Sequence, residues 1–278
     1  MANTYVTSGK AGQKARANVE EIITVLRPCI VTYTHNSTHI KTDMGDMMFT
    51  NGGGKLNLRE LVFIKRFREH YVRVGKGLDY DLGYAKVKPV YQKFNPWKGL
   101  AKDVVEIDIR RAYPTAGRIL GIVNDQFYEE GIKFPKQTFL IAIGSLNRKR
   151  KTIAVDQTGR RKILREEKPM PYMSNLWSSI VGHIDFVMQK AWALAGADAR
   201  FYWCDAIFVR RRSARKIQEL LLQYGFESRV VTLKKLEWGP EHILAINEYG
   251  DKKTYCYPQT KIVNYENLNE VARKFIRK

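Results

Sequence analysis

The chain has 278 residues, with 44% hydrophobic and 12% aromatic side chains, so it can fold around its own core without disulfides or structural metals. Its formal net charge of +20 favours nucleic acid as the partner, because each Lys or Arg that meets a phosphate displaces condensed counterions. The alternatives on charge alone are a basic protein without such a partner and a protein that binds a membrane surface. The three cysteines stand far apart, which argues against a disulfide framework or a zinc site.

The N-terminal sequence is polar and lacks the apolar core of a signal peptide, and the chain has no apolar run long enough to cross a bilayer. We therefore expect a cytoplasmic protein that has no membrane partner.

Two helices are predicted in the first part of the chain. Apolar side chains recur at helical spacing in residues 15–26 and again in residues 58–72. Asn57 precedes the second segment, and Glu60 follows three residues later, which is the spacing of a capping box.

A domain boundary is predicted near residue 100. Residues 30–34 favour a strand, and residues 75–100, rich in Gly, Tyr, Lys and Pro, are typical of a connector. We therefore expect a mostly helical accessory region over residues 1–100 and a second domain over residues 101–278.

The second part mixes strands and helices in an order typical of an α+β fold. Its best helix spans residues 174–195, where a wide apolar stripe ends at Gly196. Residues 149–155 and 161–165 predict a strongly basic hairpin that can lie along a phosphate backbone. The other predicted elements are a strand at 104–109, two short strands around a turn at 201–209, a helix at 213–224 and several strands at 226–257.

Two acidic residues stand where strands are predicted to turn. Asp108 lies at the end of one apolar strand, and Asp205 interrupts the apolar run of residues 201–209. A carboxylate in such a place needs a compensating partner, which an Arg, a backbone nest or a metal ion can supply. A pair of Mg²⁺ ions between two carboxylates is the solution found in polymerases and nucleases. On the acids alone, a turn Asp and a salt-bridged Asp remain the alternative.

The residues around both acids resemble the palm motifs of family B DNA polymerases. EIDIRRAYPTA, Glu106 to Ala116, is similar to the first motif, DxxSLYPS, and FYWCDAIFV, Phe201 to Val209, is similar to the third, YxDTDSI. LKKLEWGPE, Leu233 to Glu241, and YGDKKTY, Tyr249 to Tyr255, resemble the strands that carry the basic KKxY segment of the family. Four such elements in the right order are hard to obtain by chance.

The middle of the chain is similar in organisation to protein-primed phage polymerases, in which the second motif precedes a hairpin, a Pro and a long helix. That order returns from Phe139 to the helix at 174–195. The resemblance implies a polymerase palm, an antiparallel sheet with helices on one face, over residues 101–278. It also implies reduced fingers and a short C-terminal helix. The N-terminal part has no DxE string, so no proofreading is expected.

The resemblance assigns roles to four residues. Asp108 and Asp205 are expected to hold two Mg²⁺ or Mn²⁺ ions, with the Ile109 carbonyl as a further ligand. Tyr113 corresponds to the steric gate that excludes a 2′-hydroxyl and so favours deoxynucleotides. A buried core Tyr is the alternative for that position.

Two departures from the family pattern change the expected contacts. Leu140 replaces the Lys that neutralises the triphosphate in the second motif, and Trp203 replaces the first Asp of the third. Nucleotide binding is therefore expected from other cations, since positive charge at the phosphates is the main catalytic need: Arg110, Arg111, Lys136 and Arg148. The expected nucleic-acid contacts are Lys149, Arg150, Lys151, Arg160, Arg161, Lys252, Lys253 and Tyr255, with a solvated charged turn as the alternative for the last three.

These patterns predict a minimal family B-like DNA polymerase that adds deoxynucleotides to a 3′-hydroxyl, with priming and untemplated tailing left open. The expected partners are DNA, as primer–template or single strand, deoxynucleoside triphosphates and replication proteins. A phage source acting in a host cytoplasm follows by analogy alone. The alternatives are a palm-derived nucleic-acid-binding scaffold without activity and a metal-dependent nuclease.

Overall fold

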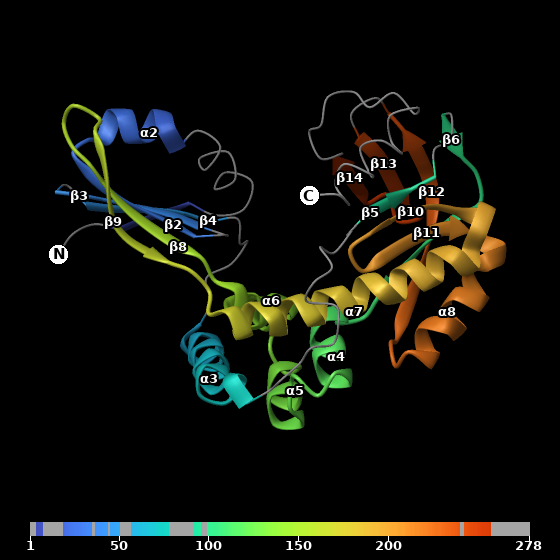
Figure 1. The fold of residues 1–278 in the computed structure, drawn as a ribbon. Helices are drawn as coiled ribbons and strands as arrows, with labels where there is room; N and C mark the ends of the chain where they lie inside the picture. The colour runs from blue at the N-terminus through green and yellow to red at the C-terminus, as the bar shows by residue number, and fades with distance from the viewer. Residues whose placement is uncertain are drawn as a thin grey trace, which may run out of the picture. The chain divides into compact units, whose positions relative to one another are not determined.

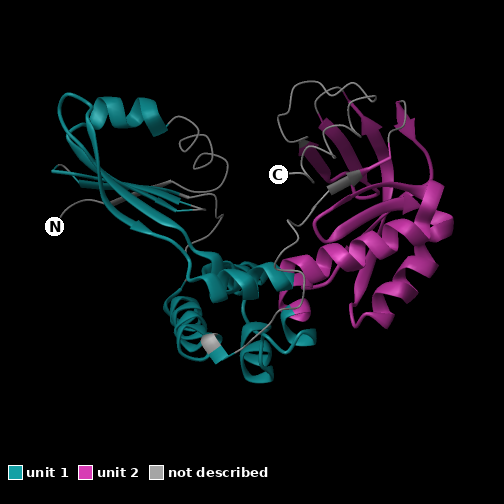
Figure 2. Cartoon of the chain, viewed as in Figure 1, with its two compact units in different colours: residues 1–87, 117–180 teal, residues 88–116, 181–278 magenta. Residues whose placement is uncertain are grey.

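The computed structural model describes residues 4–7, 19–34, 37–43, 45–50, 57–77, 92–95, 99–239 and 242–256 (Figure 1). The chain forms two compact units that are interleaved in sequence (Figure 2). Unit 1 comprises Met1–Val87 and Gly117–Ile180, and unit 2 comprises Lys88–Ala116 and Val181–Lys278. Helices and mainly antiparallel sheets occur in both, so the fold class is α+β, as the sequence predicts.

Unit 1 contains a sheet in the order β1-β4-β3-β2-β8-β9, antiparallel except for the β1–β4 pair. The strands are β1 Thr4–Thr7, β2 Cys29–Thr34, β3 Ser37–Thr42, β4 Gly45–Thr50, β8 Arg150–Val155 and β9 Arg161–Glu167. Helix α2 (Val19–Leu26) covers one face, where Val19 and Ile23 pack against alternate residues of the strands, among them Val31 and Ile153. The predicted basic hairpin is confirmed as β8–β9, and it belongs to this N-terminal sheet.

The helices of unit 1 pack through aromatic side chains. Helix α3 (Leu58–Val74) begins at the predicted capping box, which is confirmed: the Asn57 side chain accepts from the Glu60 amide at 3.0 Å. Phe63 and Phe67 of α3 contact Phe139 in α6, at ring-centroid distances of 5.5 and 6.1 Å. The other helices are η1 (Gly75–Gly77), α5 (Asp125–Gly131), α6 (Lys136–Gly144) and η3 (Ser145–Asn147).

Unit 2 contains a sheet in the order β14-β13-β12-β7-β11-β10-β5, with β6 also paired to β12. Its strands are β5 Gln92–Phe94, β6 Leu100–Ala101, β7 Val104–Ile109, β10 Ala199–Trp203, β11 Ala206–Arg210, β12 Ser228–Trp238, β13 His242–Asn247 and β14 Lys252–Cys256. Its remaining elements are η4 (Gly196–Asp198), η5 (Arg211–Ser213) and α8 (Ala214–Gln223). Two helices, α4 (Ala112–Ile119) and α7 (Pro171–Ala195), begin in one unit and end in the other.

The two faces of the unit 2 sheet differ. Figure 1 shows α7 and α8 along one face, and Trp192 of α7 contacts Tyr202 of β10 there, with ring centroids 6.1 Å apart. Side chains alternate between faces along a strand, so Ile107 of β7 points to the helices while Glu106 and Asp108 point to the opposite face. The opposite face also has its own apolar cluster: Val104, Phe201, Ala206, Phe208, Leu233, Leu236, Ile243 and Ala245.

The first 100 residues differ from the predicted mostly helical region. Their described part contains strands β1 to β4 as well as α2 and α3. These strands are short and polar on one face, as in the segment STHIKT, so their hydrophobic pattern is weak. The division of the chain also differs from a boundary near residue 100, because β2 pairs with β8, a pairing that no local pattern reveals.

Residues 112–144, for which the sequence predicts no particular helix or strand, fold into α4, α5 and α6. None of the helices in the described part of the chain is long and apolar enough to cross a membrane.

Candidate metal and nucleic-acid site

The two acids singled out by the sequence lie at the same end of neighbouring strands. Asp108 is the penultimate residue of β7, and Asp205 lies in the two-residue turn between β10 and β11. Strands β7 and β11 pair antiparallel with Asp108 opposite Ala206. The Ile109 amide donates a hydrogen bond of 2.9 Å to the Asp205 carbonyl, so the backbones of the two acid-bearing segments are in contact.

Asp108 has a cationic partner. Arg229 is opposite Asp108 in the β7–β12 pairing, and its Nε lies 2.9 Å from Asp108 Oδ2. The Asp108 side chain is 14% exposed and that of Arg229 is 54% exposed, so the carboxylate is largely buried and its arginine partner faces solvent. An Arg was one of the partners expected for a carboxylate at this position, and the structure provides it.

A second ion pair lies on the same face two residues earlier. Lys253 Nζ of β14 is 2.6 Å from Glu106 Oε1 of β7. The Glu106 side chain is almost fully buried, whereas that of Lys253 is about half exposed. Lys253, expected to contact the primer phosphates, thus has a carboxylate as its partner within the protein, and its exposed side remains accessible to a ligand.

Tyr255 of β14 links these acids. Burial raises the pKa of its phenol, and the negative charges of Glu106, Asp108 and Asp205 raise it further. Because such charge effects act over short distances, all three carboxylates lie near the Tyr255 side chain. Its ring packs edge-on or tilted against three aromatic side chains of β10 and β11: Phe201, Trp203 and Phe208. The phenol therefore stays neutral and keeps its hydrogen for donation at physiological pH.

A cavity of about 230 Å³ adjoins this cluster. Its lining combines charged and amide side chains with apolar ones, so it offers both polar and apolar contacts to a ligand. The lining residues are Glu106, Arg229, Val231, Leu233, Ala245, Asn247, Tyr249, Asp251 and Lys253.

Tyr113 and Asp185 approach the turn that carries Asp205. Burial raises the pKa of Cys204, the first turn residue, to about 11, and the charges of Asp205 and Asp185 act in the same direction. A hydrogen bond from Tyr113 of α4 to the Cys204 sulfur acts in the opposite direction. Tyr113, the predicted sugar gate, is therefore beside the Asp205 turn.

Asp185 of α7 was missed by the sequence argument. Its buried carboxylate accepts hydrogen bonds from Tyr202 Oη at 2.8 Å and from Gln189 Nε2 at 2.7 Å. The residue sits within the apolar stripe of a long helix, where a single acid carries little local signal. Gln189, one turn later on the same helix face, is the one sequence feature that could have indicated a polar pocket.

Backbone strain accompanies both acids. Cys204 has φ 53° and Arg111 has φ 50°, in the left-handed region that non-glycine residues adopt at a cost of about 1–2 kcal/mol. A third residue, Asp103, has φ 54° at the other end of β7. Strained residues of this kind cluster at functional sites, and two of the three flank the acid-bearing edge.

The donor set suits a hard divalent cation. Asp108 and Asp205 offer carboxylate oxygens, which Mg²⁺ prefers, and the Ile109 carbonyl remains a predicted third ligand. Within the described ranges, no group of three or more His, Cys, Asp or Glu side chains is placed to hold a metal. Mg²⁺ commonly binds through one or two carboxylates and completes its shell with substrate phosphates and water, so two acids are a sufficient protein contribution.

The comparisons with known proteins add no relative. No protein-family model matches the sequence, and no curated protein is significantly similar to it.

The predicted site residues divide between the two units. Unit 2 contains Asp108, Ile109, Arg110, Arg111, Tyr113, Asp205, Lys252, Lys253 and Tyr255. Unit 1 contains Lys136, Arg148, Lys149, Arg150, Lys151, Arg160 and Arg161. Arg110 lies at the acid-bearing edge, where its amide donates to the Glu227 carbonyl at 2.8 Å. Lys136 is the exposed first residue of α6.

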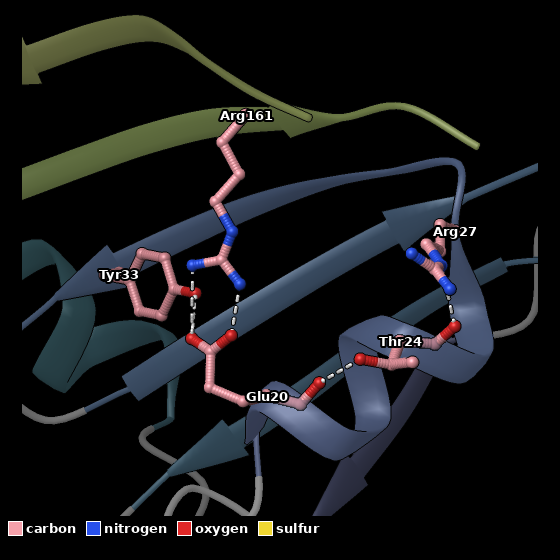
Figure 3. Close-up of polar contacts among 5 residues, drawn as sticks. All are labelled: Glu20, Thr24, Arg27, Tyr33 and Arg161. Atoms are coloured by element: carbon pink, nitrogen blue, oxygen red, sulfur yellow. Dashed lines mark hydrogen bonds and ion pairs between the residues drawn. The ribbon is translucent and has the colours of Figure 1, made fainter. Parts of the chain in front are cut away.

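Arg161 has an internal partner. Figure 3 shows its guanidinium against the Glu20 carboxylate of α2, which also accepts from Tyr33 Oη. The hydrogen bond from Arg161 lowers the pKa of Glu20, and the same bond raises the pKa of Arg161. Arg161 therefore ties α2 to the hairpin, in addition to the nucleic-acid contact expected of it.

Proposed function

We propose that unit 2 is a minimal nucleotidyltransferase of the family B DNA polymerase type, which adds deoxynucleotides to a 3′-hydroxyl. The observation that carries the proposal is the meeting of Asp108 and Asp205 at one sheet edge, joined by the hydrogen bond from the Ile109 amide to the Asp205 carbonyl at 2.9 Å. The charges of both acids reach the same tyrosine, Tyr255, which supports a shared site.

Two Mg²⁺ ions bound there would assist attack of the 3′-hydroxyl on the α-phosphate and stabilise the charge of the departing pyrophosphate. Asp108 and Asp205 supply oxygen ligands. Arg229, whose guanidinium contacts Asp108, would add positive charge beside the phosphates, and Arg110, whose Nη1 lies 4.0 Å from Glu227 Oε2, would add a second cation at this edge. Tyr255, whose pKa is raised by burial and further by its acidic neighbours, donates a hydrogen bond to a phosphate or sugar oxygen of the primer.

Tyr113 is assigned to sugar selection. Its hydroxyl is hydrogen-bonded to the Cys204 sulfur, which fixes the ring beside the Asp205 turn. A fixed ring next to the metal ligands can exclude a 2′-hydroxyl by contact, and this is the chemical basis of the preference for deoxynucleotides.

One observation favours a second function, a nucleic-acid-binding protein without synthesis. Arg229 neutralises Asp108 at 2.9 Å, and Lys253 neutralises Glu106 at 2.6 Å. Because Asp108 and Glu106 each have a cationic partner within the protein, and Asp205 lies in a turn, the three carboxylates need no metal ion to balance their charge. The two functions differ in a simple respect, because only the first requires divalent ions.

The test is incubation of a labelled primer–template with each dNTP or NTP and with Mg²⁺ or Mn²⁺. We expect extension by the wild type and a loss of at least about 100-fold in the Asp108→Asn and Asp205→Asn variants. The matched control is Asp103→Asn, at the other end of β7, where Asp103 pairs with Arg211 at 3.1 Å. Asn tolerates the positive φ of that position, so this control keeps full activity.

Metal binding gives a readout that does not depend on synthesis. Titration of Mn²⁺, followed by electron paramagnetic resonance, should show bound ions in the wild type and weaker binding in Asp108→Asn. Arg229→Met should bind Mn²⁺ more tightly, because the cation that competes for Asp108 is gone. Retardation of DNA without extension and without Mn²⁺ binding identifies the second function, and shortening of the primer identifies a nuclease.

A further inference from the structure

Three arginines of unit 1 lie where α3 meets η3, just before β8 begins. Arg68 belongs to α3, which packs against α6 (Figure 1) and also contacts η3. Arg148 follows η3, and Arg150 is the first residue of β8. Arg148 is already extended, with φ −68° and ψ 123°, so it and Arg150, two residues later, project toward the same side.

The cluster carries an excess of positive charge. Burial lowers the pKa of Arg148, and the charges of Arg150 and Arg68 lower it further, which places the three guanidinium groups close together. Glu167, which pairs with Arg150 across β8–β9, is the one acid acting in the opposite direction. Its carboxylate is shared, because Arg165 Nη2 lies 2.7 Å from Glu167 Oε1.

Two donors of the cluster have no acceptor. The Nε atoms of Arg68 and Arg150 are buried, and no atom of the described residues accepts a hydrogen bond from them. Buried donors without a partner are rare in folded proteins, and each one calls for a missing acceptor. An anion bound here would offset the repulsion among the three cations and would supply acceptors for the donors of their guanidinium groups.

We propose that Arg68, Arg148 and Arg150 form a phosphate-binding site that holds the backbone of a nucleic-acid strand. The planar guanidinium group matches phosphate oxygens with two parallel hydrogen bonds, which an ammonium group cannot do. Lys149 and Lys151 alternate with these arginines and so project to the other side of the strand. Three guanidinium groups offer more donors than one phosphate accepts, and the net charge of +20 favours a polyanion over one free nucleotide.

This site is distinct from the acid pair. It lies in unit 1 and uses no residue of the proposed metal site, so it binds a strand without divalent ions. The inference therefore stands whether or not unit 2 synthesises DNA, and it adds Arg68, a residue that no sequence pattern indicated.

The test is fluorescence anisotropy with a labelled 20-nucleotide oligo(dT) in EDTA. Arg68→Gln and Arg150→Gln should each lower the affinity about tenfold, a loss typical of a phosphate contact from a charged donor. Arg59→Gln is the matched control: it removes the same charge from an exposed position of α3, nine residues earlier and so on the opposite side of the helix. Its affinity should stay within about twofold of wild type.

Thermal unfolding of each variant checks the fold, and Arg68→Lys, which keeps the charge, should restore part of the affinity. Unchanged oligonucleotide binding in both Gln variants would overturn the site. If the Gln variants lose binding of inorganic pyrophosphate but bind the oligonucleotide unchanged, the cluster binds a free nucleotide, and the proposal of a strand-binding site is wrong. If the Gln variants lose binding while the wild type fails to extend primers, this inference holds and the proposed function fails.

Discussion

Arg229 determines how Asp108 behaves. Without a metal its guanidinium supplies the charge that a largely buried carboxylate needs, at an Nε–Oδ2 distance of 2.9 Å. The same arginine is 54% exposed, so its head group can turn toward a phosphate when a cation takes its place at Asp108. Arg229 therefore stabilises the carboxylate by itself, and in the proposed reaction it would also bind a phosphate once a metal occupies its place at Asp108.

Cys204 provides a residue-scale prediction about pH. Its pKa is about 11, raised by burial and by the charges of Asp205 and Asp185. At pH 8 the thiolate fraction is then roughly one in a thousand, so alkylation by iodoacetamide should be slow and should accelerate up to about pH 11.

Substitutions near Cys204 should change its alkylation rate in opposite directions. Asp205→Asn removes a negative charge, lowers the Cys204 pKa and should speed alkylation at pH 8 in EDTA. Tyr113→Phe removes a hydrogen bond that favours the thiolate and should slow it. Mass spectrometry of the peptide that contains Cys204 measures both rates. Equal rates in all three proteins would contradict the contacts described for this turn.

At the scale of elements, Asp198 joins two connections of unit 2. Arg212 Nε donates to its carboxylate at 2.8 Å and Ser213 Oγ at 2.6 Å, which ties η4, after α7, to η5, before α8. The hydrogen bonds from Arg212 and Ser213 hold the Asp198 pKa well below its usual value of 3.8. A depressed pKa adds stability above pH 3.8, and that stability is lost as the pH falls toward the folded-state value.

Asp198→Asn should therefore lower the free energy of unfolding at pH 7 by about 1–2 kcal/mol, because the charged hydrogen bonds are removed. The difference from wild type should shrink as the pH falls below 4, because protonation then weakens the same bonds in the wild type. Urea unfolding at pH 7, 4 and 3 measures it. The control Glu219→Gln, which breaks an exposed i,i+4 pair with Arg215, should change stability by less than about 0.5 kcal/mol.

Elements with a strong local pattern could be predicted from sequence. The capping box of Asn57 and Glu60, the strand Val104–Ile109 and the hairpin turn at Cys204 and Asp205 all lie where expected. Each rests on periodicity or turn chemistry within a few residues. The β2–β8 pairing could not be predicted, because it joins segments more than 100 residues apart and neither strand specifies its partner.

The candidate site could be predicted only where a local sequence pattern marks its residues. The acids Asp108 and Asp205 interrupt apolar strands and so stand out in the sequence. Arg229, the partner of Asp108, has no such signal and is placed only by strand register. Lys253 stands out in the sequence as a basic residue, but its pairing with Glu106 does not. A role in metal binding and catalysis stays a prediction until the assays above are done.

At the scale of the whole molecule, the net charge of +20 predicts strongly salt-dependent binding of nucleic acid. Affinity for single-stranded DNA should fall at least about tenfold between 50 and 200 mM salt. Replacing Arg68, Arg148 and Arg150 together by Gln should lower the slope of log K against log salt by about 2, close to 0.7 for each phosphate that is no longer neutralised. Arg59→Gln should leave the slope unchanged. Anisotropy titrations over a salt series measure both slopes.

The chain crosses between its two units after Val87, after Ala116 and after Ile180, and the last two crossings fall inside α4 and α7. No continuous gene fragment therefore encodes either unit. Truncation of the chain from one terminus cannot yield one unit alone, because the boundaries at Ala116 and Ile180 fall inside helices. Exchange of one unit between homologous genes would need several junctions at once, two of them within helical turns. No single cut of the chain therefore separates the acid pair from the arginine cluster, because Arg68, Asp108, Arg148 and Asp205 come from the two units in alternation.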